Sequence, residues 1–136
     1  MASFVKYYDF VEQLGLEQHQ LNTDALNVAL TNTAPTLTHT TKSQITEIAS
    51  GNGYTTGGQD TQNTWAEATG TATCAATDVT WTATGGAIAQ FRYVVLFNDT
   101  NPTDMLVGYW DYGSAVDLAS GESFTVDFTT SSFTLA

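Results

Sequence analysis

The amino-acid sequence predicts a mainly β protein, an antiparallel β-sandwich that could be jelly-roll-like, with one N-terminal α-helix. Only 12% of the 136 residues are charged and threonine is abundant, which is typical of strands whose exposed face carries hydroxyl groups. Several short segments alternate apolar and polar residues between clusters of Gly, Asn, Asp and Pro. The length suits a single domain over 1–136, with a helix and linker in 1–20 and a β-sandwich body in 21–136.

The first predicted element is a helix over 4–16. Phe4, Tyr8 and Val11 recur at helical spacing, so they share one face of such a helix. Gly15 lies near its end, where glycine commonly stops a helix. The sequence therefore predicts one amphipathic helix ahead of the strands.

The hydrophobic period then changes. Leu26, Val28 and Leu30 alternate with other residues in a period of two, which predicts a strand. The polar segment 31–41 contains a proline and predicts a loop or an irregular edge. A short helical turn is expected in 42–50.

The segments that follow the glycine-rich loop at 51–58 all have the pattern of strands. Segment 64–75 is predicted as one weak strand interrupted by Gly70. Alternation in 78–84 predicts a strand with Trp81 on its inward face. The glycine pair at 85–86 can supply the positive φ angles of a tight hairpin to the next strand.

The C-terminal part predicts a central strand and three further strands. From Phe91 to Phe97 the chain is apolar on both faces, as in a strand covered on both sides. The segment 98–104 is a cluster of turn residues. The remaining strands are expected at 105–112, 122–128 and 131–136, with 113–121 joining the first two.

The stretch "GNGYTTGG" at 51–58 could be a phosphate-binding loop or a chain reversal. A phosphate-binding P-loop needs a lysine and a Ser or Thr directly after its last glycine, and here Gln59 and Asp60 follow. The dinucleotide-binding spacing of glycines is also missed. We therefore predict a turn at Asn52–Gly53, with the ring of Tyr54 packed back onto the body.

Motifs for catalysis are missing as well. His19 and His39 lie in polar surroundings that predict exposed side chains, and no nucleophile motif lies near either. Cys74 is the only cysteine, and it is predicted to be a small buried hydrophobic residue. We expect a protein that is not an enzyme and that binds no cofactor.

The nearest approach to a metal motif lies in the turn cluster. Asp99, Asn101 and Asp104 resemble half of a calcium loop, but the central glycine is missing and Trp110 stands where the loop needs glutamate. A turn stabilised by Asx side chains is the simpler interpretation. The sequence predicts no metal site.

The negative net charge of the chain argues against nucleic acid and anionic membranes as partners. Three Lys and Arg residues against 14 Asp and Glu give a formal net charge of −11, which repels nucleic acid and anionic membranes. The cations are scattered, so no basic stripe is formed. The N-terminus lacks the pattern of a signal peptide and no apolar run is long enough to span a membrane, so we expect synthesis in a cytoplasm.

The aromatic residues leave a glycan-binding function open. Trp65, Trp81 and Trp110 could form a sugar-stacking platform on a β-sandwich, as in glycan-binding modules. Such residues more often belong to a core, and the alternation around Trp81 favours the core for that side chain.

The order of elements resembles that of small virion structural proteins of tailed bacteriophages. The likeness covers nearly the whole chain, and GNGYT-x-GG and W-T-A-x-GG-x-I are its more specific motifs. The segments that carry it are "FVKYYDFVEQLG", "LNTDALNVALTNTAP", "ITEIASGNGYTTGG", "DVTWTATGGAIAQFRYVVLFNDT", "LVGYWDYGSAVDLASGESFTVDF" and "SSFTLA".

This resemblance implies a non-enzymatic capsid decoration (cement) protein that is made in the bacterial host cytoplasm and located on the virion head surface. It would bind the major capsid protein, with no nucleic acid or membrane partner, as a homo-oligomer in which a trimer is favoured over a dimer. The alternatives are a tail or head-fibre attachment component and a glycan-binding module. Our candidate contact residues are Phe4, Tyr8 and Val11 in the predicted helix and Tyr54 in the glycine-rich loop.

Overall fold

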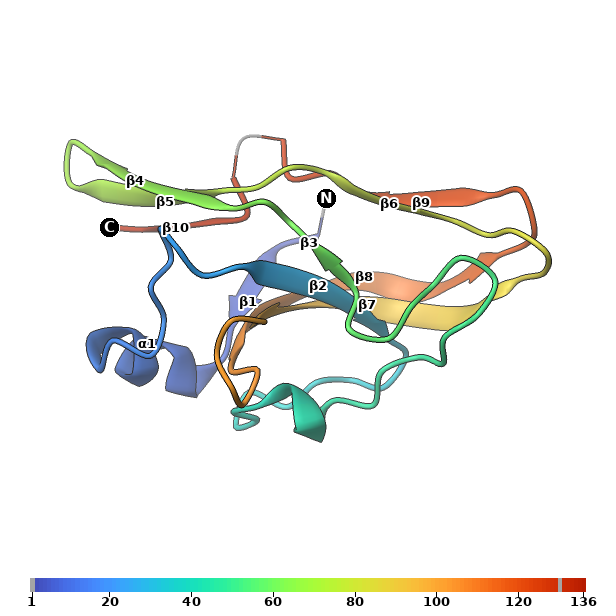
Figure 1. Cartoon of the computed structure of the whole chain (residues 1–136), viewed down its shortest axis with the longest axis horizontal. Helices are drawn as coiled ribbons and strands as arrows, with labels where there is room; N and C mark the ends of the chain where they lie inside the picture. Colours follow the sequence, from blue (N-terminus) through green and yellow to red (C-terminus); the bar gives the residue numbers. More distant parts are fainter. Residues whose placement is uncertain (1, 130) are drawn as a thin grey trace.

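The computed structural model describes residues 2–129 and 131–136. It is mainly β, with 46% strand and 8% helix, and its sheets are antiparallel. The strands form two facing layers with the α-helix at one end (Figure 1). The predicted fold class, a β-sandwich-like protein with one N-terminal α-helix, is confirmed.

The larger layer is a five-stranded sheet with the order β1-β8-β7-β2-β3. Strand β7 lies at its centre and is buried along most of its length, as its apolar residues on both faces predict. The bounds of its strands are Phe4–Lys6 for β1, Leu106–Leu118 for β8, Ile88–Asn98 for β7, Leu26–Thr31 for β2 and Gln59–Asp60 for β3.

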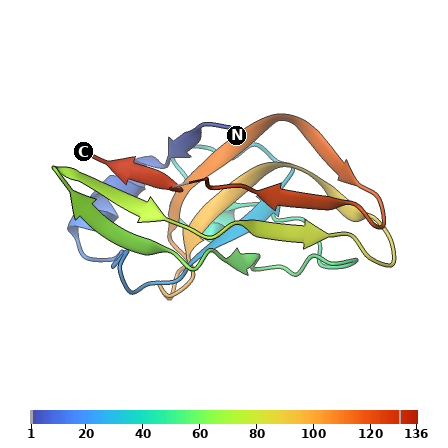
Figure 2. The same cartoon turned by 90° about the horizontal axis from the view of Figure 1, so that it is seen from above.

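The second layer consists of two smaller sheets that lie end to end (Figure 2). One has the order β10-β5-β4 and the other pairs β6 with β9. The bounds of these strands are Phe133–Leu135 for β10, Thr71–Ala75 for β5, Thr64–Ala68 for β4, Val79–Thr82 for β6 and Ser123–Val126 for β9.

One long antiparallel ribbon connects the two layers. Its two arms are β5–β6–β7 and β8–β9–β10, which stay paired from β5·β10 through β6·β9 to β7·β8. The ribbon folds over at Ala83, whose N–H donates to the Glu122 carbonyl at 2.9 Å and whose carbonyl accepts from the Gly121 N–H at 2.6 Å. The predicted hairpin at Gly85–Gly86 is wrong, because these residues form the corner at which β6 leaves one layer and β7 enters the other.

The core fills the space between the layers. Trp81 in β6 of the second layer and Trp110 in β8 of the five-stranded sheet are both fully buried in it. Tyr54 lies 5.8 Å from the Trp81 ring, and Phe128 lies 5.7 Å from the Trp110 ring, as measured between ring centroids. The inward position predicted for Trp81 is confirmed, and so is the burial predicted for Cys74.

A smaller apolar cluster lies on the other face of the five-stranded sheet. Its centre is Val95, Phe97 and Leu106, and Ile45 packs against it from the segment 32–50. That segment contains the predicted helical turn as a short 3-10 helix, η1, over Lys42–Gln44. It covers the face of the sheet that is turned away from the second layer (Figure 1).

The single helix predicted over 4–16 divides into β1 and the shorter helix α1, Tyr8–Gly15. Phe4 pairs with Trp110 in β8, and Lys6 pairs with Gly108. The Phe4 ring covers Gly108 so closely that a Cβ atom there would overlap it. Sheet pairing and this ring contact override the helical spacing, so the N-terminal segment joins the β-sandwich body instead of standing apart from it.

Two other strand predictions are corrected. Segment 64–75 is a hairpin of β4 and β5, closed by Thr69 and Gly70 with positive φ angles of 51° and 87°. The expected connection at 113–121 is shorter, because β8 continues to Leu118 and pairs with Ile88 across register shifts. In the part of the chain that the structure describes, no helix has the length and apolar character needed to cross a membrane.

Candidate protein-contact surface

Helix α1 exposes large apolar side chains to solvent. Among the described residues, the exposed large hydrophobic side chains are Tyr8, Val11 and Leu16, with exposed fractions of 66%, 53% and 58%. Tyr8 and Val11 lie three residues apart on the helix, and Leu16 directly follows it. Isolated exposed hydrophobic residues are common, but a group on one short helix makes this face the candidate contact surface.

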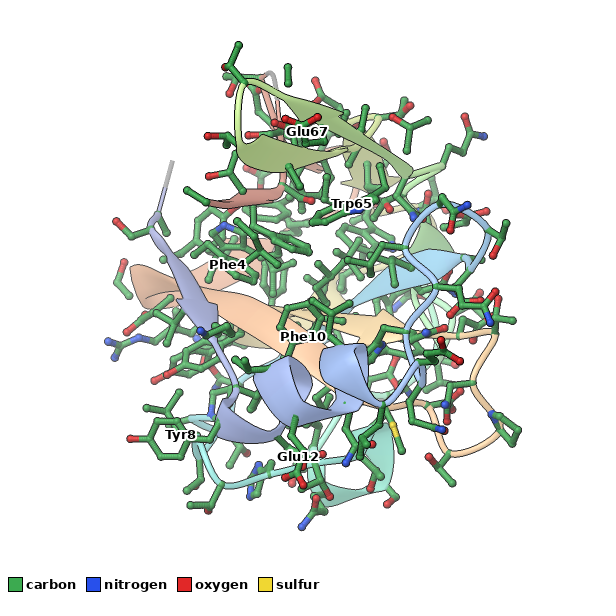
Figure 3. The ribbon with its side chains drawn as sticks, turned by 90° about the vertical axis from the view of Figure 1, so that its left-hand side faces the viewer. Phe4, Tyr8, Phe10, Glu12, Trp65 and Glu67 are labelled. Atoms are coloured by element: carbon green, nitrogen blue, oxygen red, sulfur yellow. The ribbon has the colours of Figure 1, made fainter. Side chains whose placement is uncertain are left out.

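The opposite side of α1 holds the helix against the body. Phe10 is buried, with its ring 5.6 Å from Phe133 and 5.1 Å from His19. Figure 3 shows Phe10 directed toward the sheets, whereas Tyr8 and Glu12 are directed away from them. The helix starts after Tyr7, whose N–H donates to the Val107 carbonyl at 3.2 Å. These contacts determine which side of α1 faces solvent.

Carboxylates surround the apolar side chains of α1. Glu12 and Glu17 are exposed, and Asp9 is half-buried and accepts a 3.2 Å hydrogen bond from the Gln13 amide. Two of the three cations of the chain are engaged elsewhere, Lys42 with Glu47 and Arg92 with Asp111. The third cation, Lys6, is exposed at the end of β1, two residues before α1 begins. The exposed face of α1 itself carries apolar side chains and carboxylates.

The structure separates the four candidate contact residues. Tyr8 and Val11 are exposed, whereas Phe4 is half-buried and stacks on Phe133 with centroids 4.9 Å apart. Tyr54 is 2% exposed, so a partner cannot reach its ring in this conformation. We correct the candidate set by withdrawing Phe4 and Tyr54 and by adding Leu16. The sequence could have predicted Leu16, because it follows Tyr8 by eight residues and so lies on the same side of the helical pattern.

Tyr54 instead anchors the glycine-rich loop. Its hydroxyl accepts a 3.0 Å hydrogen bond from the Leu30 N–H and donates to the Glu47 carboxylate. Burial and the bond to Glu47 raise the pKa of the Tyr54 hydroxyl, so it stays protonated. The Gly57 N–H donates to the same carboxylate at 2.7 Å. A protein carboxylate thus takes the loop amide that a phosphate would need, and the predicted turn with an inward-packed Tyr54 is confirmed.

His19 is 4% exposed, so the prediction of an exposed side chain is wrong. The His19 Nδ1 accepts a hydrogen bond from the Asn98 side-chain amide nitrogen at 3.1 Å. The same Asn98 nitrogen also donates to the Asp24 carboxylate at 2.6 Å. Burial lowers the pKa of His19, and the carboxylates of Asp24 and Asp9 oppose this effect. Its Nε2 has no hydrogen-bond partner in the described part of the chain. This contact joins the segment after α1 to the end of β7.

The turn after β7 has the predicted Asx structure. The Asn98 side-chain carbonyl accepts from the N–H groups of Thr100 and Asn101, each at 3.1 Å. The Asn101 side-chain carbonyl accepts from the Thr103 N–H at 3.0 Å. Within residues 2–129 and 131–136, no three His, Cys, Asp or Glu residues are grouped so that they could hold a metal ion.

A shallow groove lies between this turn and η1. Lys42, Ile45, Pro102 and Asp104 are among the residues that line it. The Lys42 ammonium is paired with Glu47, and desolvation raises the pKa of Asp104. The groove thus combines an engaged cation with a carboxylate, and it shows no arrangement specific for a ligand.

Comparison of the chain with protein-family models, curated proteins and solved structures finds no match. The candidate site therefore rests on geometry and chemistry: an exposed apolar and acidic helix face on a β-sandwich-like body.

Proposed function

We propose that this chain is a non-enzymatic structural protein of a tailed-bacteriophage virion and serves as a capsid decoration (cement) protein on the outside of the assembled head. The observation that carries the proposal is the gathering of exposed large apolar side chains on α1. The sequence resemblance to virion proteins supplies the biological setting. A densely hydrogen-bonded β body with one such face suits a role in contact better than one in chemistry.

The proposed mechanism is linkage between binding and particle stability. A protein that binds the assembled, expanded lattice and bridges major capsid protein subunits stabilises that lattice by its binding free energy. Helix α1 has 8 residues, whereas a stable protein interface takes roughly 20–30 residues on each side. One α1 contact is therefore weak, and we propose that a homo-oligomer, a trimer before a dimer, adds several such contacts through avidity.

Heating particles with and without this protein tests the cement role. We expect heads that lack it to release their DNA at a lower temperature, and purified protein added back to restore the higher value. Equal disruption temperatures would refute the role, since a protein that stabilises the lattice must raise the temperature at which it fails.

Copy number separates cement from an attachment component of the tail or of head fibres. Hundreds of copies per particle support cement, and a handful support the attachment component. The glycan-binding alternative has less support, because Trp81 and Trp110 are buried and Trp65 is half-buried, with its ring 6.1 Å from that of Phe133 between centroids.

A further inference from the structure

Gly15 is a glycine that the fold does not require. All eleven glycines lie in the described chain. Nine of them have φ angles in the range that favours glycine, and Gly108 lies directly beneath the Phe4 ring. Gly15 has neither feature, and a Cβ atom at this position would meet no described atom within 4 Å apart from its chain neighbours and the backbone of its own helix.

Helix termination does not explain Gly15 either. The left-handed residue that follows α1 is Glu17, with a φ angle of 62°, and the Gln18 N–H donates to the Gln13 carbonyl at 2.9 Å across this end. Glycine costs up to about 1 kcal/mol relative to alanine inside a helix. A glycine at such a position allows another backbone or side chain to approach the helix closely.

The position of Gly15 fits such an approach. It follows Val11 by four residues and Tyr8 by seven, so all three lie on the outward side of α1. Leu16 adds a second exposed apolar side chain beside it. The bare backbone at Gly15 is thus flanked by the exposed apolar side chains of α1.

The charges of this face determine what could cover it. Glu12 lies between Tyr8 and Leu16, four residues from each, and Glu17 lies at the end of the helix. In a chain of net charge −11, a second copy placed face to face would bring its own carboxylates against these. Like charges across an interface disfavour that arrangement, whereas a cation on the partner would complement them.

We propose that the outward face of α1 is the docking site for an apolar, cationic segment of the capsid shell, which crosses the helix at Gly15 and pairs a lysine or arginine with Glu12. The face consists of Tyr8, Val11, Glu12, Gly15 and Leu16. The proposal rests on the contact function proposed above, and it adds the position of the contact and the chemistry of the partner.

Two substitutions test the two parts of the proposal separately. Gly15→Gln fills the bare position with a good helix former, so the stability of the protein stays equal or rises while binding to heads falls at least about tenfold. Glu12→Gln removes the charge without changing shape, so binding falls roughly fivefold and becomes less sensitive to salt. Asp117→Asn is the matched control, since it makes the same charge change at the far end of β8 and leaves binding unchanged.

The first assay titrates each variant onto phage heads stripped of this protein and measures binding by sedimentation. If the wild type binds and all variants bind equally, the docking proposal is overturned and the decoration role stands. If the wild type binds no heads, the decoration role fails and the capsid shell is ruled out as the partner. The second assay then decides only whether this face binds an apolar, cationic segment.

The second assay uses an amphipathic helical peptide of leucine and lysine and a matched peptide of leucine and glutamate. The lysine peptide should shift the amide NMR signals of residues 8–17 in the wild type and not in Gly15→Gln, and the glutamate peptide should leave them unchanged. Shifts spread over the carboxylates of the whole surface would overturn the proposal. Self-association of the wild type that Gly15→Gln abolishes would also overturn it, since the occupant would then be a second copy.

Discussion

At the residue scale, hydrogen bonds between separate segments determine the environments of the buried polar side chains His19 and Tyr54. His19 has polar neighbours in the chain, yet its imidazole is buried because Asn98, 79 positions later, donates a hydrogen bond to it. Tyr54 stands among glycines and threonines, and its hydroxyl connects Leu30 to Glu47. In both cases the hydrogen-bond partners lie in other segments of the chain, so the neighbouring residues do not identify them, although the inward packing of the Tyr54 ring was predicted correctly.

The buried imidazole leads to a prediction of pH dependence. The pKa of His19 in the folded protein is lowered from its ordinary value of 6.5. As the pH falls below about 6.5, this imidazole therefore binds more protons in the unfolded chain than in the folded protein. The free energy of unfolding therefore falls as the pH drops below about 6.5, by at most about 1.4 kcal/mol per pH unit for this one group. Urea unfolding from about pH 7.5 to about pH 5 measures it.

Comparison of variants isolates the contribution of His19 from that of the carboxylates. His19→Gln keeps a side-chain carbonyl that can accept from Asn98, and it should remove this part of the pH dependence. His39→Gln, the control, should retain the wild-type profile. A wild-type profile that is unchanged by His19→Gln would contradict the prediction.

At the scale of elements, the sequence predicts strands where the pattern of burial is local. The apolar residues on both faces of β7 and the alternation in β6 predict both elements well. Strand β1 was missed because the spacing of Phe4, Tyr8 and Val11 fits a helix, and pairing with β8 is not visible in that spacing. The corner at Gly85–Gly86 was missed for a related reason, since a glycine pair allows both a hairpin and a change of layer.

The four candidate contact residues also separate into those whose exposure follows from a local pattern and those that distant segments cover. Tyr8 and Val11 lie within α1, so their exposure follows from the helical period, which places Phe10 on the other side. Phe4 and Tyr54 are withdrawn by contacts to Phe133 and Leu30, which belong to distant strands. Sequence periodicity could therefore find the exposed helix face and the inward position of Trp81, but it could not find that pairing with β8 covers Phe4.

Strand β1 should contribute to stability in proportion to the burial of Phe4. Phe4→Ala removes the ring that stacks on Phe133 and covers Gly108. We expect it to lower the free energy of unfolding by roughly 2–3 kcal/mol, somewhat less than for a fully buried phenylalanine. Tyr8→Ala, four residues later and exposed, should change it by no more than about 0.5 kcal/mol. Equal effects in urea unfolding would mean that β1 does not pair with β8 in solution.

At the scale of the whole molecule, the hydrogen-bonded β body is combined with a large unbalanced charge. The chain has 14 Asp and Glu residues against three Lys and Arg, and two of those cations are held by Glu47 and Asp111. Most carboxylates thus lack a cationic partner in the described residues. Hydroxyl pairs take the place of ion pairs between β6 and β9, where Thr80 bonds to Thr125 at 2.8 Å and Thr82 to Ser123 at 2.7 Å.

This charge distribution predicts that salt stabilises the protein. Repulsion among carboxylates opposes the compact state, and raising NaCl from about 0.02 M to about 0.5 M shortens the screening length enough to suppress most of it. Near pH 7.5, above the range in which His19 titrates, we expect a gain of roughly 1 kcal/mol, seen as an increase of about 3–5 °C in Tm. A variant with Glu17→Gln, Asp60→Asn and Asp117→Asn should start from a higher Tm at low salt and gain less. If salt instead lowers Tm, the ion pairs Lys42–Glu47 and Arg92–Asp111 outweigh the repulsion, since they are the attractive charge contacts that salt would weaken.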